Sequence, residues 1–132
     1  AGLRMGLAIA QPPVLDRLRA FGSTISSVTG VTAARISVDD PTLVPTRRAY
    51  TKQAREETFA FLSKNNYGFH PSVSNCFMLD AKRPAGELAT AMAQRNVLIG
   101  RTWPAWPNYS RVTVGTPDGM RQCCAALKEV MA

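Results

Sequence analysis

Three arginines stand in apolar or glycine-rich surroundings, and they are the residues of this chain best suited to do chemistry. Arg4 lies in a glycine-flanked apolar stretch, Arg101 follows Val97–Gly100, and Arg111 begins an alternating stretch. An unpaired guanidinium is costly to bury, so each of these side chains needs an anionic partner. Carboxylates and phosphates match its planar fork. The pattern therefore predicts binding of small anions or of acidic side chains.

The net charge of +7 on 132 residues does not by itself indicate a nucleic-acid surface. Sixteen residues are basic, of which four are lysine and the other twelve arginine. The largest cluster, Arg47 and Arg48 followed by Lys52 and Arg55, runs directly into two glutamates. Such mixed charge is more typical of a solvated helix face than of a phosphate-binding stripe. We expect no nucleic-acid partner, although a non-catalytic basic α+β module that binds acidic partners or nucleic acid stays open as the alternative.

The composition indicates a folded protein of ordinary size. The hydrophobic share is 45%, and no apolar run reaches the 18 residues of a membrane span, so we expect no membrane partner. Three cysteines are too few for a disulfide framework, which favours a reducing compartment, and we expect a cytoplasmic protein. The single histidine, His70, has no partner at metal-ligand spacing, so no metal site is expected.

The first forty residues predict a short buried strand at Leu3–Ala10 and then two helices. Pro12 and Pro13 fit the first turn of a helix that ends at Gly22, and a second helix is expected within Ser23–Asp39. A long helix from Pro41 to Asn65 follows, because apolar residues recur there at helical spacing.

The remaining residues predict a small mixed unit of three strands and two helices. Asn65–Gly68 is a stop signal for the long helix. The expected elements are a strand at Cys76–Leu79, a helix at Pro84–Gln94, a strand at Val97–Gly100, a Trp/Pro-rich loop at Thr102–Ser110, a strand at Arg111–Gly115 and a helix from Thr116 to Met131.

Four stretches in this order resemble the class I/II pyridoxal-phosphate-dependent aminotransferases of fold type I. Each motif alone is weak, but all four in register cover essentially the whole chain, and the last two are closest to the histidinol-phosphate aminotransferase branch. The stretches are Ala1-Gly2-Leu3-Arg4-Met5-Gly6, Pro71-Ser72 through Asn75-Cys76-Phe77, Val97-Leu98-Ile99-Gly100-Arg101, and Arg111-Val112-Thr113-Val114-Gly115-Thr116 with the helix after it.

The resemblance implies an α/β fold of which this chain is the C-terminal part. Residues 1–40 would be the tail of the large cofactor-binding domain, and residues 41–66 a long interdomain helix. Residues 67–132 would form the small C-terminal α+β domain, in the order β-α-β-β-α. The full-length enzyme would be a homodimer.

The resemblance also assigns roles to individual residues. Arg4 matches the ligand of the cofactor phosphate, and Arg111 the residue that clamps the substrate carboxylate. Arg101 matches a residue that helps to hold the distal anion of the substrate, and Asn75 one near the carboxylate. Trp103 and Trp106 fall where substrate-facing loops vary, but Trp-Pro pairs often brace a loop, which favours packing over substrate binding.

The function implied is transamination of an amino acid or an amino-phosphate such as histidinol phosphate, with 2-oxoglutarate as the expected 2-oxo acid acceptor. The cofactor would be pyridoxal 5'-phosphate. The Schiff-base lysine of the family would lie upstream of residue 1, so we expect this chain to be inactive alone. Lys64 ends a polar helix and is not followed by a strand arginine at the right distance, so it does not fit that role.

Overall fold

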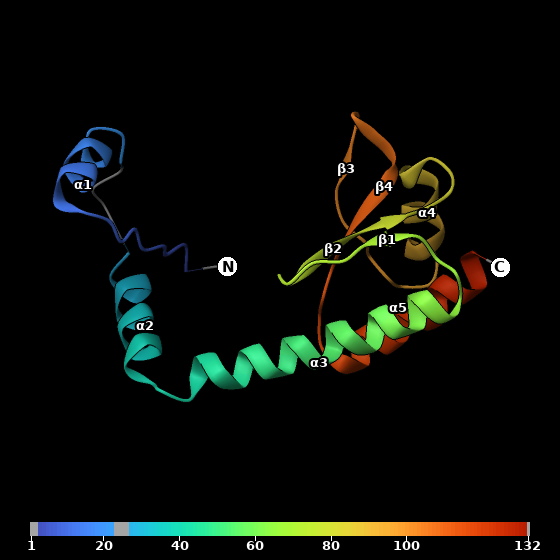
Figure 1. Cartoon of the computed structure of the whole chain (residues 1–132), viewed down its shortest axis with the longest axis horizontal. Coiled ribbons are helices and arrows are strands. Elements are labelled where there is room, and N and C mark those ends of the chain that lie inside the picture. Colours follow the sequence, from blue (N-terminus) through green and yellow to red (C-terminus); the bar gives the residue numbers. More distant parts are fainter. Residues whose placement is uncertain (1–2, 23–26, 132) are drawn as a thin grey trace. The chain divides into compact units, whose positions relative to one another are not determined.

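The computed structural model describes residues 3–22 and 27–131 and divides into two compact units, Ala1–Pro45 and Thr46–Ala132. Figure 1 shows the elements in chain order.

The first unit holds two helices, α1 (Pro12–Arg19) and α2 (Val28–Asp39), both of which the sequence predicts. Residues 23–26 of the second predicted helix lie outside the described residues. The strand expected at Leu3–Ala10 is wrong: the described residues 3–10 form no strand and are exposed. A strand is stabilised by hydrogen bonds to a neighbouring strand, and the described residues of this unit provide none.

Helix α3 (Leu43–Lys64) matches the long helix predicted between Pro41 and Asn65. It buries one stripe, formed by Ala54, Thr58 and Leu62 at intervals of four residues, against the core of the second unit. The helix ends in a Schellman motif, in which the N–H of Asn66 donates to Ser63 and the N–H of Tyr67 to Leu62.

A four-stranded antiparallel sheet forms the centre of the second unit, with strand order β1-β2-β4-β3. Its pairs follow one another as β1 with β2, β2 with β4, and β4 with β3. The strands are β1 (Phe69–His70), β2 (Cys76–Asp80), β3 (Thr102–Trp103) and β4 (Trp106–Thr113).

The sheet corrects two expectations. No strand forms at Val97–Gly100, and the region Thr102–Ser110, expected to be a loop, is most of a β-hairpin. Trp103 pairs with Trp106 across a turn made of only two residues, Pro104 and Ala105. Two residues suffice to reverse an antiparallel pair, so the prolines mark the turn and its edge and do not prevent pairing.

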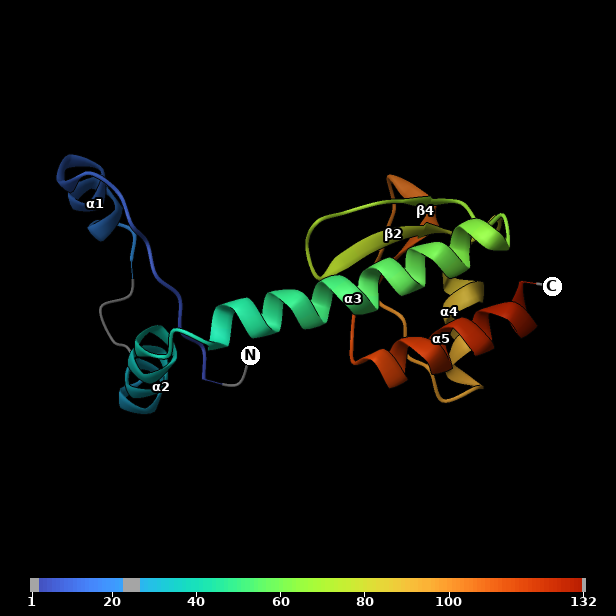
Figure 2. The same cartoon turned by 60° about the horizontal axis from the view of Figure 1, so that its bottom comes forward.

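Three helices cover one face of this sheet. Helices α4 (Ala85–Ala93) and α5 (Pro117–Val130) join α3 on that face, and Figures 1 and 2 both show α3 and α5 side by side. The core between helices and sheet is apolar and includes Leu62, Phe77, Leu79, Leu88, Met92, Val112, Met120, Cys123 and Leu127.

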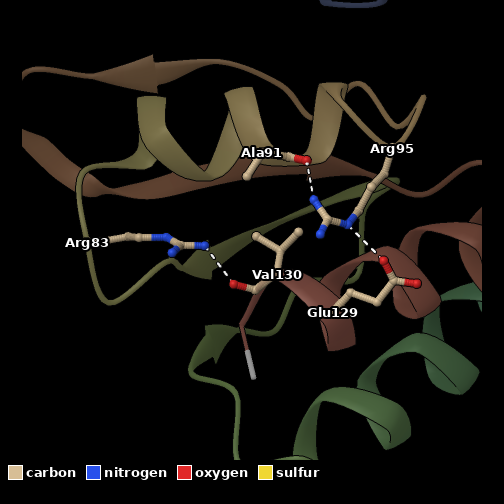
Figure 3. Close-up of polar contacts among 5 residues, drawn as sticks. All are labelled: Arg83, Ala91, Arg95, Glu129 and Val130. Atoms are coloured by element: carbon tan, nitrogen blue, oxygen red, sulfur yellow. Dashed lines mark hydrogen bonds and ion pairs between the residues drawn. The ribbon is translucent and has the colours of Figure 1, made fainter.

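Two arginines connect the ends of α4 and α5 (Figure 3). Arg83 donates to the carbonyl oxygen of Val130 at 2.8 Å, which satisfies one of the last carbonyls of α5. The Nε of Arg95 donates to Glu129 at 2.8 Å, and another of its nitrogens donates to the carbonyl of Ala91 at 3.1 Å. These contacts connect the residues on either side of α4 to the C-terminal end of α5.

Within residues 3–22 and 27–131, no helix is both long enough and apolar enough to cross a membrane.

Candidate functional site

The face of the sheet opposite the three helices carries the candidate site. Side chains alternate along a strand, so Phe77, Leu79 and Val112 point into the core while their neighbours point away from it. The register places Met78 beside Arg111 on this open face. The same face holds His70, which pairs with Met78, and also Asp80 and Tyr109, which pair with each other.

Arg111 is half-buried at the centre of the open face and is held by an aromatic ring. Its Cζ lies 5.8 Å from the centroid of the Trp103 ring, a cation–π geometry. Its Nε is buried without a hydrogen-bond partner. No ion pair among the described residues uses its guanidinium. A half-buried cation with no carboxylate partner is ready to receive an anion.

The backbone of Arg101 is hydrogen-bonded to the backbone of Arg111. The N–H of Gly100 donates to the carbonyl of Arg111 at 3.0 Å, and the N–H of Arg111 donates to the carbonyl of Arg101 at 3.2 Å. Gly100 and Arg101 therefore both lie opposite the single residue Arg111, which is the pattern of a β-bulge. The bulge places two of the three sequence-predicted arginines beside each other, Arg111 on the interior strand β4 and Arg101 directly before β3, with the side chain of Arg101 exposed.

Asn75 directly precedes β2 and lies at the opposite end of the open face from the hairpin turn. Its carbonyl accepts a hydrogen bond from the N–H of Val114 at 2.8 Å, which extends the pairing of β2 with β4. Its side chain is exposed. Asn75 is thus fixed by its backbone near the end of the strand that carries Arg111.

An aromatic cluster beside Arg111 was missed by the sequence analysis. His70 stacks on Tyr109 with ring centroids 5.2 Å apart, and Trp106 lies 6.0 Å from Tyr109 and 6.5 Å from His70. His70 is exposed and belongs to β1, directly before Pro71. Its aromatic partners are far along the chain, so only the strand pairing reveals the cluster.

A small apolar cleft opens at the hairpin. It has a volume of about 320 Å³ and is lined by Met78, Trp103, Ala105 and Trp106. Since Met78 pairs with Arg111 and the ring of Trp103 faces its guanidinium, the cleft adjoins the cation. The site therefore combines one unpaired cation with an apolar recess.

Asp80 on the same face is already paired. It forms an ion pair of 2.8 Å with Lys82 and accepts a hydrogen bond from the N–H of that residue. The hydrogen bond from the Lys82 side chain holds the pKa of Asp80 below its usual 3.8. Asp80 is therefore a charged neighbour of the aromatic cluster whose carboxylate is already paired with Lys82.

Arg4 lies in the first unit, near α2. It is exposed, has a positive φ of 50°, and is not at the head of a strand as expected. It lines a cleft of about 740 Å³ with Gly30, Ser37 and Val38 of α2. Gly30 is needed for this packing, because a Cβ there would lie 2.8 Å from the carbonyl oxygen of Leu3.

No group of three or more His, Cys, Asp or Glu side chains in the described part of the chain is arranged to hold a metal ion.

Comparisons with known proteins match nearly the whole chain. The family model described as aminotransferase class I and II matches residues 1–127. A histidinol-phosphate aminotransferase of Symbiobacterium thermophilum is 34% identical over 134 residues, which cover 99% of this chain and 37% of the relative. Histidinol-phosphate aminotransferase 2 of Haemophilus influenzae is 26% identical and is covered to 36%. The chain thus spans little more than a third of the length of these curated relatives.

Solved structures agree with these matches. A putative histidinol-phosphate aminotransferase of Erwinia carotovora atroseptica superposes with a TM-score of 0.90 at 27% identity, over 98% of this chain and 38% of that one. An L-threonine-O-3-phosphate decarboxylase of Porphyromonas gingivalis superposes with a TM-score of 0.71 at 22% identity, which shows a shared fold alone.

Proposed function

The chain belongs to the class I and II aminotransferase family, and from that premise we propose that it is the carboxylate-binding part of a pyridoxal-phosphate-dependent aminotransferase. The reaction would move an amino group from a donor to a 2-oxo acid. The observation that carries the proposal is Arg111: a half-buried guanidinium on an open sheet face, with no carboxylate of the described residues paired to it.

Arg111 would bind the α-carboxylate of the substrate. A guanidinium offers two parallel N–H donors, so it fixes the plane of a carboxylate as well as its position. Trp103 holds the guanidinium from one side by its ring, which lowers the conformational freedom that binding would otherwise remove. Arg111 would thereby orient the Cα of the substrate for proton transfer.

Arg101 and Asn75 would assist Arg111 in binding the substrate. Arg101 is placed beside Arg111 by the bulge and carries an exposed cation, which suits a second, distal anion of the substrate. Asn75 would contribute an amide donor near the carboxylate, because its backbone is fixed to Val114 at the end of β4.

Pyridoxal 5'-phosphate is the cofactor on which this family depends, and Arg4 is the residue of this chain that we propose as its phosphate ligand. The guanidinium is exposed and forms no ion pair with a described residue, which fits a dianion that needs charged donors. The cofactor supplies an electron sink for the charge that develops at the Cα of the substrate. The lysine that carries the cofactor is expected outside this chain.

An amino acid or an amino-phosphate such as histidinol phosphate is our proposed donor class, and 2-oxoglutarate the acceptor, because several relatives are named histidinol-phosphate aminotransferases. Histidinol phosphate has no carboxylate, so with this donor Arg111 would bind the carboxylate of the 2-oxo acid acceptor. We further propose that residues 1–40 complete a large domain, that α3 joins the two domains, and that the full-length enzyme is a homodimer. The division of the chain at Pro45 is compatible with this arrangement.

The test is Arg111→Ala in the full-length enzyme loaded with pyridoxal phosphate. We expect kcat/KM for a carboxylate donor such as glutamate to fall by about 30- to 5000-fold, since truncating one partner of a hydrogen-bonded charge pair costs roughly 2–5 kcal/mol. Arg111→Lys keeps the charge and should lose less. Arg121→Ala is the matched control, because that arginine is exposed on α5 and pairs only with Asp118.

Unchanged affinity for the carboxylate substrate in Arg111→Ala would overturn the assignment. The cofactor absorbance should stay unchanged in all three variants, because Arg111 is not its proposed ligand. A loss of absorbance in Arg111→Ala would instead indicate a disturbed fold, and unfolding by circular dichroism separates that result from loss of binding.

A further inference from the structure

Arg55 lies in the middle of α3 and connects this helix to the segment that leads into β2. Its Nη1 donates to the carbonyl oxygen of Val73 at 3.0 Å and to that of Ser74 at 3.1 Å. Figure 2 shows the chain between β1 and β2 turning back beside α3. Ser74 is followed directly by Asn75, so the two hydrogen bonds end one residue before a proposed substrate ligand.

Arg55 belongs to the basic cluster of α3, but its environment differs from that of its neighbours. Arg47, Arg48 and Lys52 are exposed, whereas Arg55 is half-buried. No ion pair among the described residues uses the Arg55 guanidinium. Its charge is therefore directed at two neutral carbonyl oxygens, and such charge-assisted hydrogen bonds are roughly twice as strong as neutral ones.

The segment 71–75 has few other contacts that fix its position. Val73 is 94% exposed, so burial of its side chain does not anchor the segment. The N–H groups of Ser74 and Cys76 donate to serine hydroxyls of the same segment, at 3.0 and 3.2 Å. These bonds are local, so they hold the shape of the segment but not its place. Among the described residues, only Arg55 ties the carbonyls of Val73 and Ser74 to the helix layer.

The two hydrogen bonds also require a particular backbone shape. Successive carbonyls of an extended strand point in opposite directions, so one nitrogen does not reach two of them in succession. Residues 73–75 are bent, and both carbonyls reach Arg55. The next carbonyl, that of Asn75, accepts from the N–H of Val114 on the sheet side. Asn75 therefore lies between two fixed points, the guanidinium of Arg55 and the end of the sheet.

We propose that Arg55 is a positioning residue for substrate binding: it holds the bend at 73–75 and thereby fixes Asn75 at the carboxylate site. Arg55 acts through the backbone and needs no contact with the substrate. An amide donor that is already in place binds more tightly than one that must be ordered on binding, because ordering costs free energy. This inference rests on the proposed role of Asn75.

The test compares KM and kcat for glutamate in the full-length enzyme loaded with pyridoxal phosphate. Arg55→Met removes the donors and keeps an unbranched side chain of high helix propensity. We expect KM to rise by about tenfold, because a small misplacement of a binding group is costly. We expect kcat to stay within about twofold, because a group that binds ground state and transition state alike affects KM alone. A merely structural role would instead lower kcat through a smaller folded fraction and leave KM unchanged.

Two further variants make the comparison specific. Arg55→Lys restores a cation with several donors, so it should recover most of the affinity for glutamate. Lys52→Met is the matched control, because it removes a cation one turn earlier on α3 whose exposed ion pair with Glu56 contributes little. Its KM and kcat should equal those of the wild type. An equal rise of KM in Lys52→Met and Arg55→Met would overturn the proposal, since the net charge of α3 would then explain both.

A double variant shows whether Arg55 acts through Asn75. Asn75→Ala should raise KM by about tenfold, and adding Arg55→Met should raise it by less than about twofold more, because residues that act as one unit are not additive. Effects that multiply to about a hundredfold would show that the two residues act independently, and the positioning role would be wrong.

Hydrogen exchange gives a readout that is independent of turnover. The amides of Ser74 and Cys76 should exchange about tenfold faster in Arg55→Met than in the wild type, because the segment opens locally once its tie to α3 is lost. Lys52→Met should leave their exchange unchanged. Equal exchange in Arg55→Met and the wild type would contradict the proposal.

The outcomes also separate this inference from the proposed function. A higher KM in Asn75→Ala without a higher KM in Arg55→Met overturns the positioning role and leaves the proposed function intact. An unchanged KM in Asn75→Ala overturns the role of Asn75 together with this inference, while Arg111→Ala tests the carboxylate site by itself.

Discussion

The carbonyl oxygen of Arg111 accepts a hydrogen bond from the N–H of Gly100 at 3.0 Å, and a Cβ on residue 100 would lie only 2.5 Å from that same oxygen. The backbone of residue 100 lies too close to this oxygen to leave room for a side chain. The bulge that aligns Arg101 with Arg111 therefore requires glycine at position 100. The placement of the charged residues thus depends on a residue that has no side chain.

Gly100→Ala should therefore destabilise the protein. The added methyl group meets backbone and not a flexible side chain, and overpacking of this kind costs about 1–3 kcal/mol. Urea unfolding measures the change. The matched control is Gly86→Ala in α4, where nothing lies within 4 Å of the new Cβ and where alanine should stabilise the helix by about 0.5–1 kcal/mol. Equal effects of the two substitutions would contradict the steric argument.

Asn96 should tolerate glycine but not alanine. It ends α4 with a φ of 59°, and the N–H groups of Asn96 and Val97 donate to Ala93 and Met92 in a Schellman motif. The left-handed conformation costs a residue with a Cβ about 1–2 kcal/mol, less for asparagine and nothing for glycine. Thermal unfolding should show Asn96→Ala less stable than the wild type and Asn96→Gly at least as stable. A more stable alanine variant would exclude this conformation.

The N-terminus of α5 should depend on a hydroxyl group. The side chain of Thr116 accepts a hydrogen bond from the N–H of Gly119 at 3.0 Å. Thr116→Ala leaves that donor without its partner and should cost about 1 kcal/mol in the free energy of unfolding, whereas Thr116→Ser keeps the oxygen and should cost little. If serine and alanine are equally destabilising, the methyl group and not the hydroxyl is what stabilises this end.

Acid should remove the contribution of Asp80 to stability. Its pKa in the folded protein is below 3.8, so its stabilisation is complete above that value and is lost as the pH falls through the folded pKa. Asp80→Asn should therefore lower the Tm at pH 6, and the difference from the wild type should shrink below about pH 3.8. Glu56→Gln is the control, because its ion pair with Lys52 is exposed and contributes little. A difference independent of pH would point to packing and not to charge.

The helices could be predicted from the sequence because their signals are local. Pro12 and Pro117 mark the first turns of α1 and α5, and Asn66 and Asn96 mark the ends of α3 and α4. Each signal acts within one turn of its own helix. Family membership, identified from four short motifs, is also confirmed.

The sheet could not be predicted in the same way, because its pairings join distant residues. The two residues of β1 carry no periodic signal, and His70 is classified as a strand residue only because it pairs with Met78. The Trp-Pro pairs suggested a loop, whereas Pro104 is one of the two turn residues and Pro107 lies just after the turn, in β4. For the same reason the aromatic cluster was invisible in the sequence, although Arg111 itself was identified. The roles of Arg4, Asn75, Arg101 and Arg111 stay predictions.

The alternation of β4 also determines where the length of this chain can change. Arg111 points to the open face and Val112 into the core, so inserting or deleting one residue within the strand would exchange them and bury a guanidinium in place of a valine. The turn at Pro104 and Ala105 lies beyond the paired register and has no such constraint. Related proteins should therefore differ in length at this turn, while the strand keeps a fixed number of residues.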